Sequence, residues 1–247
     1  MAWIHMAYCK PVGAICAGEG AYPSVNEGQM SVKNCGYGYR GYSYRECTNG
    51  SLGPEVTTHC VLLPPENVRY SSTGFVFVIG QTVSTGIPLV RNIATNWEIS
   101  SQSLPAGLSL SSTTGEISGI PTERVSSQSV TMNGQSDGAS QKVVLTFTVL
   151  LPLSAFSYPQ STYILPRSQS FSDTPLITGD VPVYSIESGE LPPGLTLDSM
   201  NGMIYGSPSQ SITDQNVVIK AENAVSNQTF PLSFTTRILR TVVHYSQ

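Results

Sequence analysis

The chain has 247 residues, which suffices for two or three small modules and is too long for one small sandwich. Charged residues make up only 11% of it, and the abundance of Ser, Thr, Gly and Pro favours strands and turns over helices. The net charge of −4 excludes the basic footprint of a nucleic-acid-binding protein, and no apolar run reaches the roughly 18 residues that a membrane-spanning helix requires.

All five cysteines lie in the first 60 residues, in a stretch with few aliphatic side chains. This clustering predicts a disulfide framework in an oxidising compartment. A zinc site is the alternative, but no C-x-x-C pair occurs and no histidine has finger spacing. Because five is odd, one thiol is free, pairs with another chain, or has lost its partner at the end of the segment. The cysteines are Cys9, Cys16, Cys35, Cys47 and Cys60.

The segment after Cys35 is rich in tyrosine and arginine. Its glycines formally satisfy the G-x-G-x-x-G dinucleotide fingerprint, which we reject because a cysteine precedes it and no helix follows. Protein interfaces favour tyrosine and arginine, so this segment is the candidate binding patch. The alternative is strand alternation, in which half of the tyrosines replace a missing aliphatic core. The patch comprises Tyr37, Tyr39, Arg40, Tyr42, Tyr44 and Arg45.

The spacing C-x-x-G-Y-x-G followed by R-x-C-x-x-G, from Cys35 to Gly50, resembles small extracellular modules of the hormone-receptor and sushi-like groups. This resemblance implies that four cysteines pair and that Cys9 is the unpaired or intermolecular one. The pairing set would be Cys16, Cys35, Cys47 and Cys60. Four cysteines allow three connectivities, and the sequence does not choose among them.

Two N-glycosylation sequons begin at Asn49 and Asn227, consistent with a secreted or cell-surface protein. Residues 1–8 lack the basic start and the apolar core of a signal peptide. We therefore expect a mature chain or an interior segment of a longer extracellular protein.

An internal repeat determines the organisation of the remaining chain. Leu104–Leu110 (LPAGLSL) recurs as Leu191–Leu197 (LPPGLTL), and 191 − 104 gives an offset of 87. Thr114–Pro121 recurs as Asn201–Pro208 at the same offset, and a Val-Leu-Leu-Pro linker precedes both copies. We predict a disulfide-rich module at 1–62, sandwiches at 63–150 and 151–240, and a tail or the start of a further segment at 241–247.

Each copy has an all-β pattern. Val143–Val149 and Phe230–Thr236 alternate apolar and polar residues, as do strands with one buried face. Turn signals such as Asn201-Gly202 recur about every dozen residues, which predicts a seven-stranded sandwich. In the Leu-Pro-x-Gly-Leu block, we expect proline to end a strand, glycine to allow a sharp reversal and the leucines to enter the core. Glycines lining a ligand site are the alternative.

The run from Trp97 to Thr122 resembles the immunoglobulin-like, cadherin-like repeat family with its "W-x-I … LPAGL … TGEISGTP" signature. The second copy departs from the signature at Tyr184, Asn201 and Tyr205. The resemblance implies an all-β chain, with two tandem seven-stranded Ig/cadherin-like sandwiches after a small disulfide-rich β module. It also implies β-sandwich rods that act as spacers, adhesins or scaffold parts, with no catalytic residues.

We expect neither catalysis nor a cofactor. No H-E-x-x-H, G-x-S-x-G or P-loop motif occurs. Calcium between domains is the alternative to no cofactor, although the acidic motifs of cadherins are missing. Its candidate ligands are Asp173, Asp180 and Glu187.

Three functions remain. The first is an extracellular structural protein, part of a surface coat, appendage or filament, assembling with copies of itself or with other surface proteins. The second is an adhesin that binds glycans or a receptor through the Tyr/Arg segment. The third is an accessory module of a larger secreted enzyme.

Overall fold

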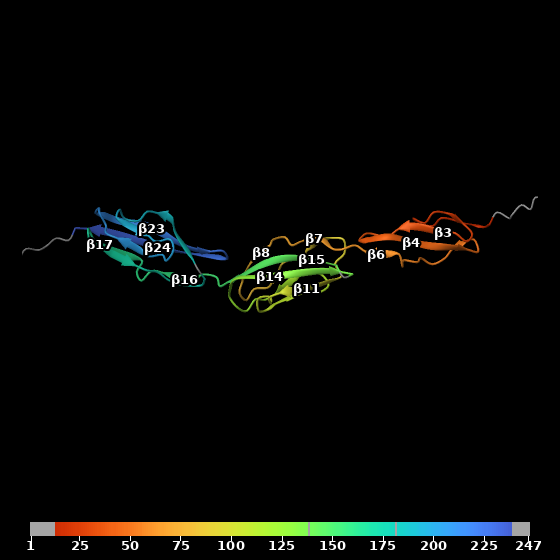
Figure 1. Cartoon of the computed structure of the whole chain (residues 1–247). Coiled ribbons are helices and arrows are strands. Elements are labelled where there is room, and N and C mark those ends of the chain that lie inside the picture. Colours follow the sequence, from red (N-terminus) through yellow and green to blue (C-terminus); the bar gives the residue numbers. More distant parts are fainter. Residues whose placement is uncertain (1–12, 138, 181, 239–247) are drawn as a thin grey trace, which may run out of the picture.

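The computed structural model describes residues 13–137, 139–180 and 182–238, and the described chain is built from strands and turns. In Figure 1 the strands form three groups that follow one another along an extended molecule. No helix in the described ranges is long and apolar enough to cross a membrane. The first group, the N-terminal module, contains β1 (Ile15–Cys16), β2 (Val25–Asn26), β3 (Met30–Asn34), β4 (Tyr39–Thr48), β5 (Ser51–Leu52) and β6 (Cys60–Leu62).

The second group is sandwich 1, in which a four-stranded sheet of order β11-β14-β15-β8 accompanies a three-stranded sheet of order β12-β13-β9 and the pair β10-β7. A long hairpin, β14 with β15, lies at the centre of the four-stranded sheet. The strands of sandwich 1 are β7 (Glu66–Arg69), β8 (Gly74–Val78), β9 (Val83–Ser84), β10 (Leu89–Arg91), β11 (Asn96–Ser101), β12 (Leu108–Leu110), β13 (Ile117–Gly119), β14 (Val125–Ser136) and β15 (Ala139–Leu150).

Sandwich 2 repeats this topology, with sheets of order β17-β24-β23-β20 and β18-β22-β21 and the pair β16-β19. Its strands are β16 (Ser154–Ser157), β17 (Thr162–Pro166), β18 (Phe171–Asp173), β19 (Leu176–Thr178), β20 (Val183–Gly189), β21 (Leu195–Leu197), β22 (Ile204–Gly206), β23 (Ile212–Asn223) and β24 (Ser226–Arg237). The start of β23 follows that of β14 by 212 − 125 = 87 residues, the offset of the sequence repeat.

The all-β tandem sandwich is confirmed, and each copy contains nine strand segments where seven strands were predicted. The first strand of sandwich 1 is divided into β7 and β8. The β7 segment pairs antiparallel with β10, and the β8 segment pairs parallel with β15. The second is split into β9 and β10 by the turn that contains Gly86 and Pro88. Proline lacks a donor for the ladder and Gly86 has φ +71°, so pairing cannot continue through this turn.

Each sandwich has its own hydrophobic core. In sandwich 1, Phe147 is fully buried and stacks on Phe75, with ring centroids 5.8 Å apart. In sandwich 2, Phe234 occupies the equivalent position, 147 + 87, and stacks on Tyr163 at 5.2 Å. Apolar burial is the main stabilising contribution in a sandwich, and here it is divided between two separate clusters.

The repeated signature residues pack against one another in both sandwiches. Tyr70 donates a hydrogen bond from its hydroxyl to the carbonyl of Gly115 at 2.6 Å. Tyr158 does the same to Gly202 at 2.5 Å, one repeat later. Burial raises the pKa of Tyr70 to about 12, which keeps this hydroxyl protonated. The signature glycine thus belongs to a structural contact in each core.

The Leu-Pro-x-Gly-Leu block pairs with the end of β13. The Ile120 N–H donates to the Gly107 carbonyl at 3.1 Å, and Leu104 and Leu108 pack against the core. Gly107 has φ +87°, and a Cβ there would lie 1.9 Å from the Ile120 carbonyl oxygen. Close contact between two backbone segments therefore accounts for this glycine without a ligand.

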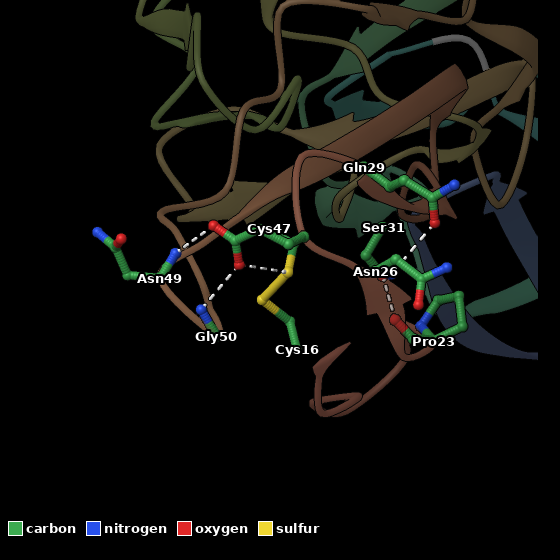
Figure 2. Close-up of a disulfide and its surroundings, with 9 residues drawn as sticks. Cys16, Pro23, Asn26, Gln29, Ser31, Cys47, Asn49 and Gly50 are labelled. Carbon is green, nitrogen blue, oxygen red and sulfur yellow. Dashed lines mark hydrogen bonds between the residues drawn. A yellow bond between two sulfur atoms is a disulfide. The ribbon is translucent and has the colours of Figure 1, made fainter. Parts of the chain in front are cut away.

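The N-terminal module is held together mainly by covalent and polar contacts. Cys16 and Cys47 are fully buried and form a disulfide (Figure 2). Beside them, the hydroxyl of buried Tyr22 lies 2.8 Å from the Ser43 hydroxyl. A module this small buries too little apolar surface to be stable alone, which is why disulfides are common in such modules.

Candidate functional site

The Tyr/Arg segment occupies β4 and the turn before it, and strand geometry divides its side chains between two sides of the sheet. Successive residues of a strand point to opposite faces, and directly paired residues share a face. Tyr44 pairs with Val32 of β3, and Arg40 pairs with Val61 of β6. Tyr39 instead lines a depression on the other side, together with Ser43. The six predicted residues therefore do not form one patch.

The side that carries Tyr42 and Tyr44 is an exposed aromatic face, which we define by Met30, Val32, Tyr42, Tyr44, His59 and Val61. The ring of Tyr42 stacks on His59, with centroids 4.7 Å apart, and Tyr44 lies 6.0 Å from the same ring. Exposed fractions of 56% for Met30 and 43% for Tyr42 leave apolar surface in contact with solvent. Contiguous apolar surface of this kind marks an interaction site more often than single exposed residues do.

Arg45 points to the opposite side and serves the fold. Its guanidinium donates to Glu19 at 2.5 Å and lies over the Tyr22 ring, 5.1 Å from the centroid. An ion pair combined with a cation–π contact holds the residues around β1 and β2 against β4. Arg45 is therefore a structural residue of the module.

The same side carries an open depression of about 330 Å³, which we call the tyrosine pocket. Its lining includes Lys33, Tyr37, Tyr39, Ser43 and Glu55, and the Cys35–Cys60 disulfide. The ammonium of Lys33 lies 3.2 Å from Glu55, a contact that raises the pKa of Lys33. Hydrogen bonds from Tyr22, Ser43 and Lys33, in that order of weight, lower the pKa of Glu55. Both groups are therefore charged at neutral pH.

The sequence did not single out Lys33 or Glu55. Lys33 faces Ser43 across the β3–β4 pair, whereas Glu55 lies in the loop after β5. Only the alternation of β3 and β4 could have placed Lys33 beside Ser43. No local signal in the sequence brings Glu55 to them.

Four of the five cysteines form two disulfides, Cys16–Cys47 and Cys35–Cys60. This is one of the three connectivities that the sequence left open. Cys9 lies outside the described residues, so its free or intermolecular state stays a prediction. Glu27 lies close to the sulfurs of Cys16 and Cys47, but these sulfurs are bonded to each other and offer no thiolate to a metal.

Glu27 acts instead on the neighbouring hairpin. Its carboxylate accepts hydrogen bonds from the N–H groups of Asn49, at 2.6 Å, and Gly50, at 2.9 Å. Figure 2 shows these two residues beside the disulfide. Asn49 and Gly50 have φ +54° and +75°, as a two-residue hairpin turn requires. Asn49 and Asn227 are both exposed, and their glycosylation stays a prediction.

Two of the three candidate calcium ligands are engaged by protein groups. Asp173 accepts hydrogen bonds from the Tyr163 hydroxyl and from the Thr174 N–H. Asp180 accepts from the Leu151 N–H and from Arg124. Glu187 is exposed on β20. Calcium binding stays a prediction.

Asp180 belongs to a joint between the two sandwiches. Its carboxylate accepts the N–H of Leu151 and the Arg124 guanidinium, both at 2.6 Å. Burial opposes ionisation of this carboxyl, but the Leu151 N–H and Arg124 outweigh it and the pKa of Asp180 is lowered. The carbonyl of Leu151 accepts from the Asp180 N–H at 3.2 Å and from the Asn223 side chain at 3.3 Å. Leu151 of the linker is thus held by hydrogen bonds at both its N–H and its carbonyl.

The joint between the N-terminal module and sandwich 1 also holds its linker through a backbone carbonyl. The carbonyl of Pro64, the last residue of the first Val-Leu-Leu-Pro linker, accepts the Asn92 side-chain N–H at 2.8 Å. The Asn92 backbone N–H donates to the Tyr37 hydroxyl at 3.2 Å. In both joints, a residue that holds the linker comes soon after a strand of the short two-stranded pair. Asn92 follows β10 of the β7–β10 pair, and Asp180 follows β19 of the β16–β19 pair. Tyr37 of the predicted patch is therefore a joint residue.

Two stretches of the chain, residues 60–151 and 148–239, match the family He_PIG, named "Putative Ig domain". The fold is similar to Sidekick-1 immunoglobulin domains 1-5, at a TM-score of 0.52 and 11% identity over 91% of this chain and 57% of that one. It is also similar to Drosophila OTK extracellular domains 3-5, at a TM-score of 0.50 and 10% identity over 81% and 71% of the two chains. No curated protein matches the chain. At these identities the likeness extends to the fold alone.

Proposed function

The chain belongs to the immunoglobulin-like family He_PIG, with two tandem copies, and we propose that it is an extracellular, non-catalytic scaffold or adhesion rod. Its copies would keep a defined spacing and present the N-terminal module at one end. Two disulfides support an oxidising, extracellular location. The cadherin-like character of the repeats and the sushi-like character of the module remain part of this proposal.

The hydrogen bonds that hold both linkers are the observation that carries the proposal. Free linkers between domains allow relative motion, whereas a linker whose carbonyl is hydrogen-bonded by the next domain restricts it. Pro64 of the first linker and Leu151 of the second are both held in this way, at neighbouring positions of the Val-Leu-Leu-Pro repeat. A carbonyl of each linker is thus hydrogen-bonded to the sandwich that follows it, which restricts motion at both joints.

Small-angle X-ray scattering of the whole chain tests the rod. We expect Asp180→Ala to broaden the distribution of interatomic distances, because it removes the contacts to Leu151 and Arg124. Glu187→Ala is the matched control, since it removes one exposed carboxylate from the same sandwich. A rod held by its joints is refuted if the Asp180 and Glu187 variants scatter alike.

Assembly of copies through module–module contacts is the finer part of the proposal, and the exposed aromatic face supports it. Sedimentation equilibrium at micromolar concentration should detect association in the native chain and weaker association in Tyr42→Ser. Tyr205→Ser is the matched control, because Tyr205 is exposed to a similar extent, 42% against 43%, on sandwich 2. A native chain that is monomeric throughout favours the adhesin, in which this face binds another surface protein. A catalytic domain elsewhere in the full-length protein would favour the accessory module.

A further inference from the structure

The tyrosine pocket lies in the N-terminal module, apart from the hydrophobic cores of the two sandwiches. Its volume of about 330 Å³ lies at the small end of the range of ligand pockets, about 300–1,000 Å³. The pocket lies next to the joint, because Tyr37 lines it and also contacts Asn92 of sandwich 1. Ligand sites are often found at such domain boundaries.

The walls of the pocket are fixed before any ligand arrives. The Cys35–Cys60 disulfide joins the turn before β4 to the start of β6, on either side of the pocket. Backbone pairing of Tyr39 with Leu62 adds a second connection between the same elements. Preorganised walls reduce the entropy lost on binding, so even a small ligand can gain net affinity.

Opposite charges in the pocket balance each other. The ammonium of Lys33 has three N–H donors, and one of them is directed to Glu55 at 3.2 Å. The carboxylate of Glu55 has acceptor capacity beyond its bonds to Lys33, Tyr22 and Ser43, whereas the buried Ser43 hydroxyl is already bonded to Tyr22 and Glu55. An anionic ligand would meet Glu55 and a cationic ligand would meet Lys33. A neutral ligand with many hydroxyl groups can pair with both.

Two partly exposed rings complete the pocket. Tyr39 is 40% exposed and Tyr37 is 75% exposed, so each offers ring surface to a ligand. A pyranose ring has an apolar face of C–H groups and a polar edge of hydroxyls. The C–H face suits an aromatic ring, and the hydroxyl edge suits Lys33 and Glu55.

We propose that the tyrosine pocket binds one neutral sugar residue, with Tyr39 against the C–H face and the Lys33–Glu55 pair at the hydroxyl edge. This site is distinct from the aromatic face, which lies on the other side of the sheet. The pocket adjoins the joint between the module and sandwich 1 through Tyr37, whereas Lys33, Tyr39 and Glu55 make none of the joint hydrogen bonds described above.

Saturation-transfer NMR on the whole chain tests the proposal, with the methyl glycosides of galactose, glucose, mannose and N-acetylglucosamine as probes. We expect transfer to the ring C–H protons of at least one of these sugars. Tyr39→Ala should weaken binding at least roughly threefold, the loss expected when an aromatic contact is removed. Glu55→Gln should weaken it as well, because the amide accepts fewer hydrogen bonds than the carboxylate.

Tyr42→Ala is the matched control, since it removes a tyrosine from the opposite side of β4 and should leave binding unchanged. Non-reducing peptide mass analysis verifies that each variant keeps both disulfides and is therefore folded. The proposal is overturned by absence of transfer to all four sugars, by equal transfer in Tyr39→Ala and the native chain, or by equal losses in Tyr39→Ala and Tyr42→Ala.

Discussion

Gly107→Ala should destabilise sandwich 1 more than Gly86→Ala, although both glycines have positive φ, +87° and +71°. A Cβ on Gly86 meets no atom within 4 Å, so this substitution costs only the left-handed backbone, roughly 1–2 kcal/mol. A Cβ on Gly107 would lie 1.9 Å from the Ile120 carbonyl oxygen, which requires the two backbone segments to separate.

Separation would break two backbone hydrogen bonds, from the Ile120 N–H to Gly107 at 3.1 Å and from the Thr122 N–H to Ala106 at 3.0 Å. Each contributes about 0.5–1.5 kcal/mol net. Added to the cost of the positive φ, they predict a loss of roughly 2–5 kcal/mol at Gly107. The free energy of unfolding of a small domain is about 5–15 kcal/mol. The variant should therefore fold, but unfold at a lower urea concentration than the native chain.

Urea unfolding of the whole chain measures this loss. Trp97 is 4% exposed in sandwich 1, and in a Trp3→Phe background it is the single tryptophan. Its fluorescence then reports the free energy of unfolding of sandwich 1. Equal losses in Gly107→Ala and Gly86→Ala would refute the argument, because the close contact of the two backbone segments would then have no energetic effect.

Further predictions concern Tyr70 and the buried disulfide. Tyr70→Phe should cost about 1–2 kcal/mol in the same titration, because the Gly115 carbonyl loses its donor; no change would mean that water replaces it. Since the pKa of Tyr70 is about 12 in the folded state and 10 ordinarily, the stability that its neutral form contributes is complete below pH 10 and is lost as the pH rises towards 12. Tyr70→Phe should lose less stability across that interval, and equal pH profiles would contradict this. Replacing Cys16 and Cys47 together with alanine removes a bridge of sequence separation 31, worth about 3–4 kcal/mol. Hydrogen exchange in the module should then accelerate while the Trp97 transition stays in place, and a shifted transition would show that the units are coupled.

The organisation of this protein could be predicted from the sequence because its signals are local and repeated. Similar blocks at an offset of 87 residues are expected to occupy equivalent places, and turn glycines and alternating strands act over a few neighbouring residues. The repeat therefore indicated two sandwiches, and the cysteine cluster indicated a separate module. The sequence did not explain why Gly115 recurs in the second copy, because its partner Tyr70 is 45 residues away and no local signal marks it.

The functional surfaces depend on which strands pair, and pairing is a property of the tertiary structure. A run of tyrosines and arginines appeared as one patch, but the pleat of β4 sends Tyr42 to an exposed face and Tyr39 to a pocket. Glu55 joins that pocket from a loop whose sequence carries no sign of it. The connectivity of the disulfides and the joints at Pro64 and Leu151 were likewise decided by contacts between residues far apart in the chain. Composition and periodicity act within a segment, whereas register and packing decide which segments meet.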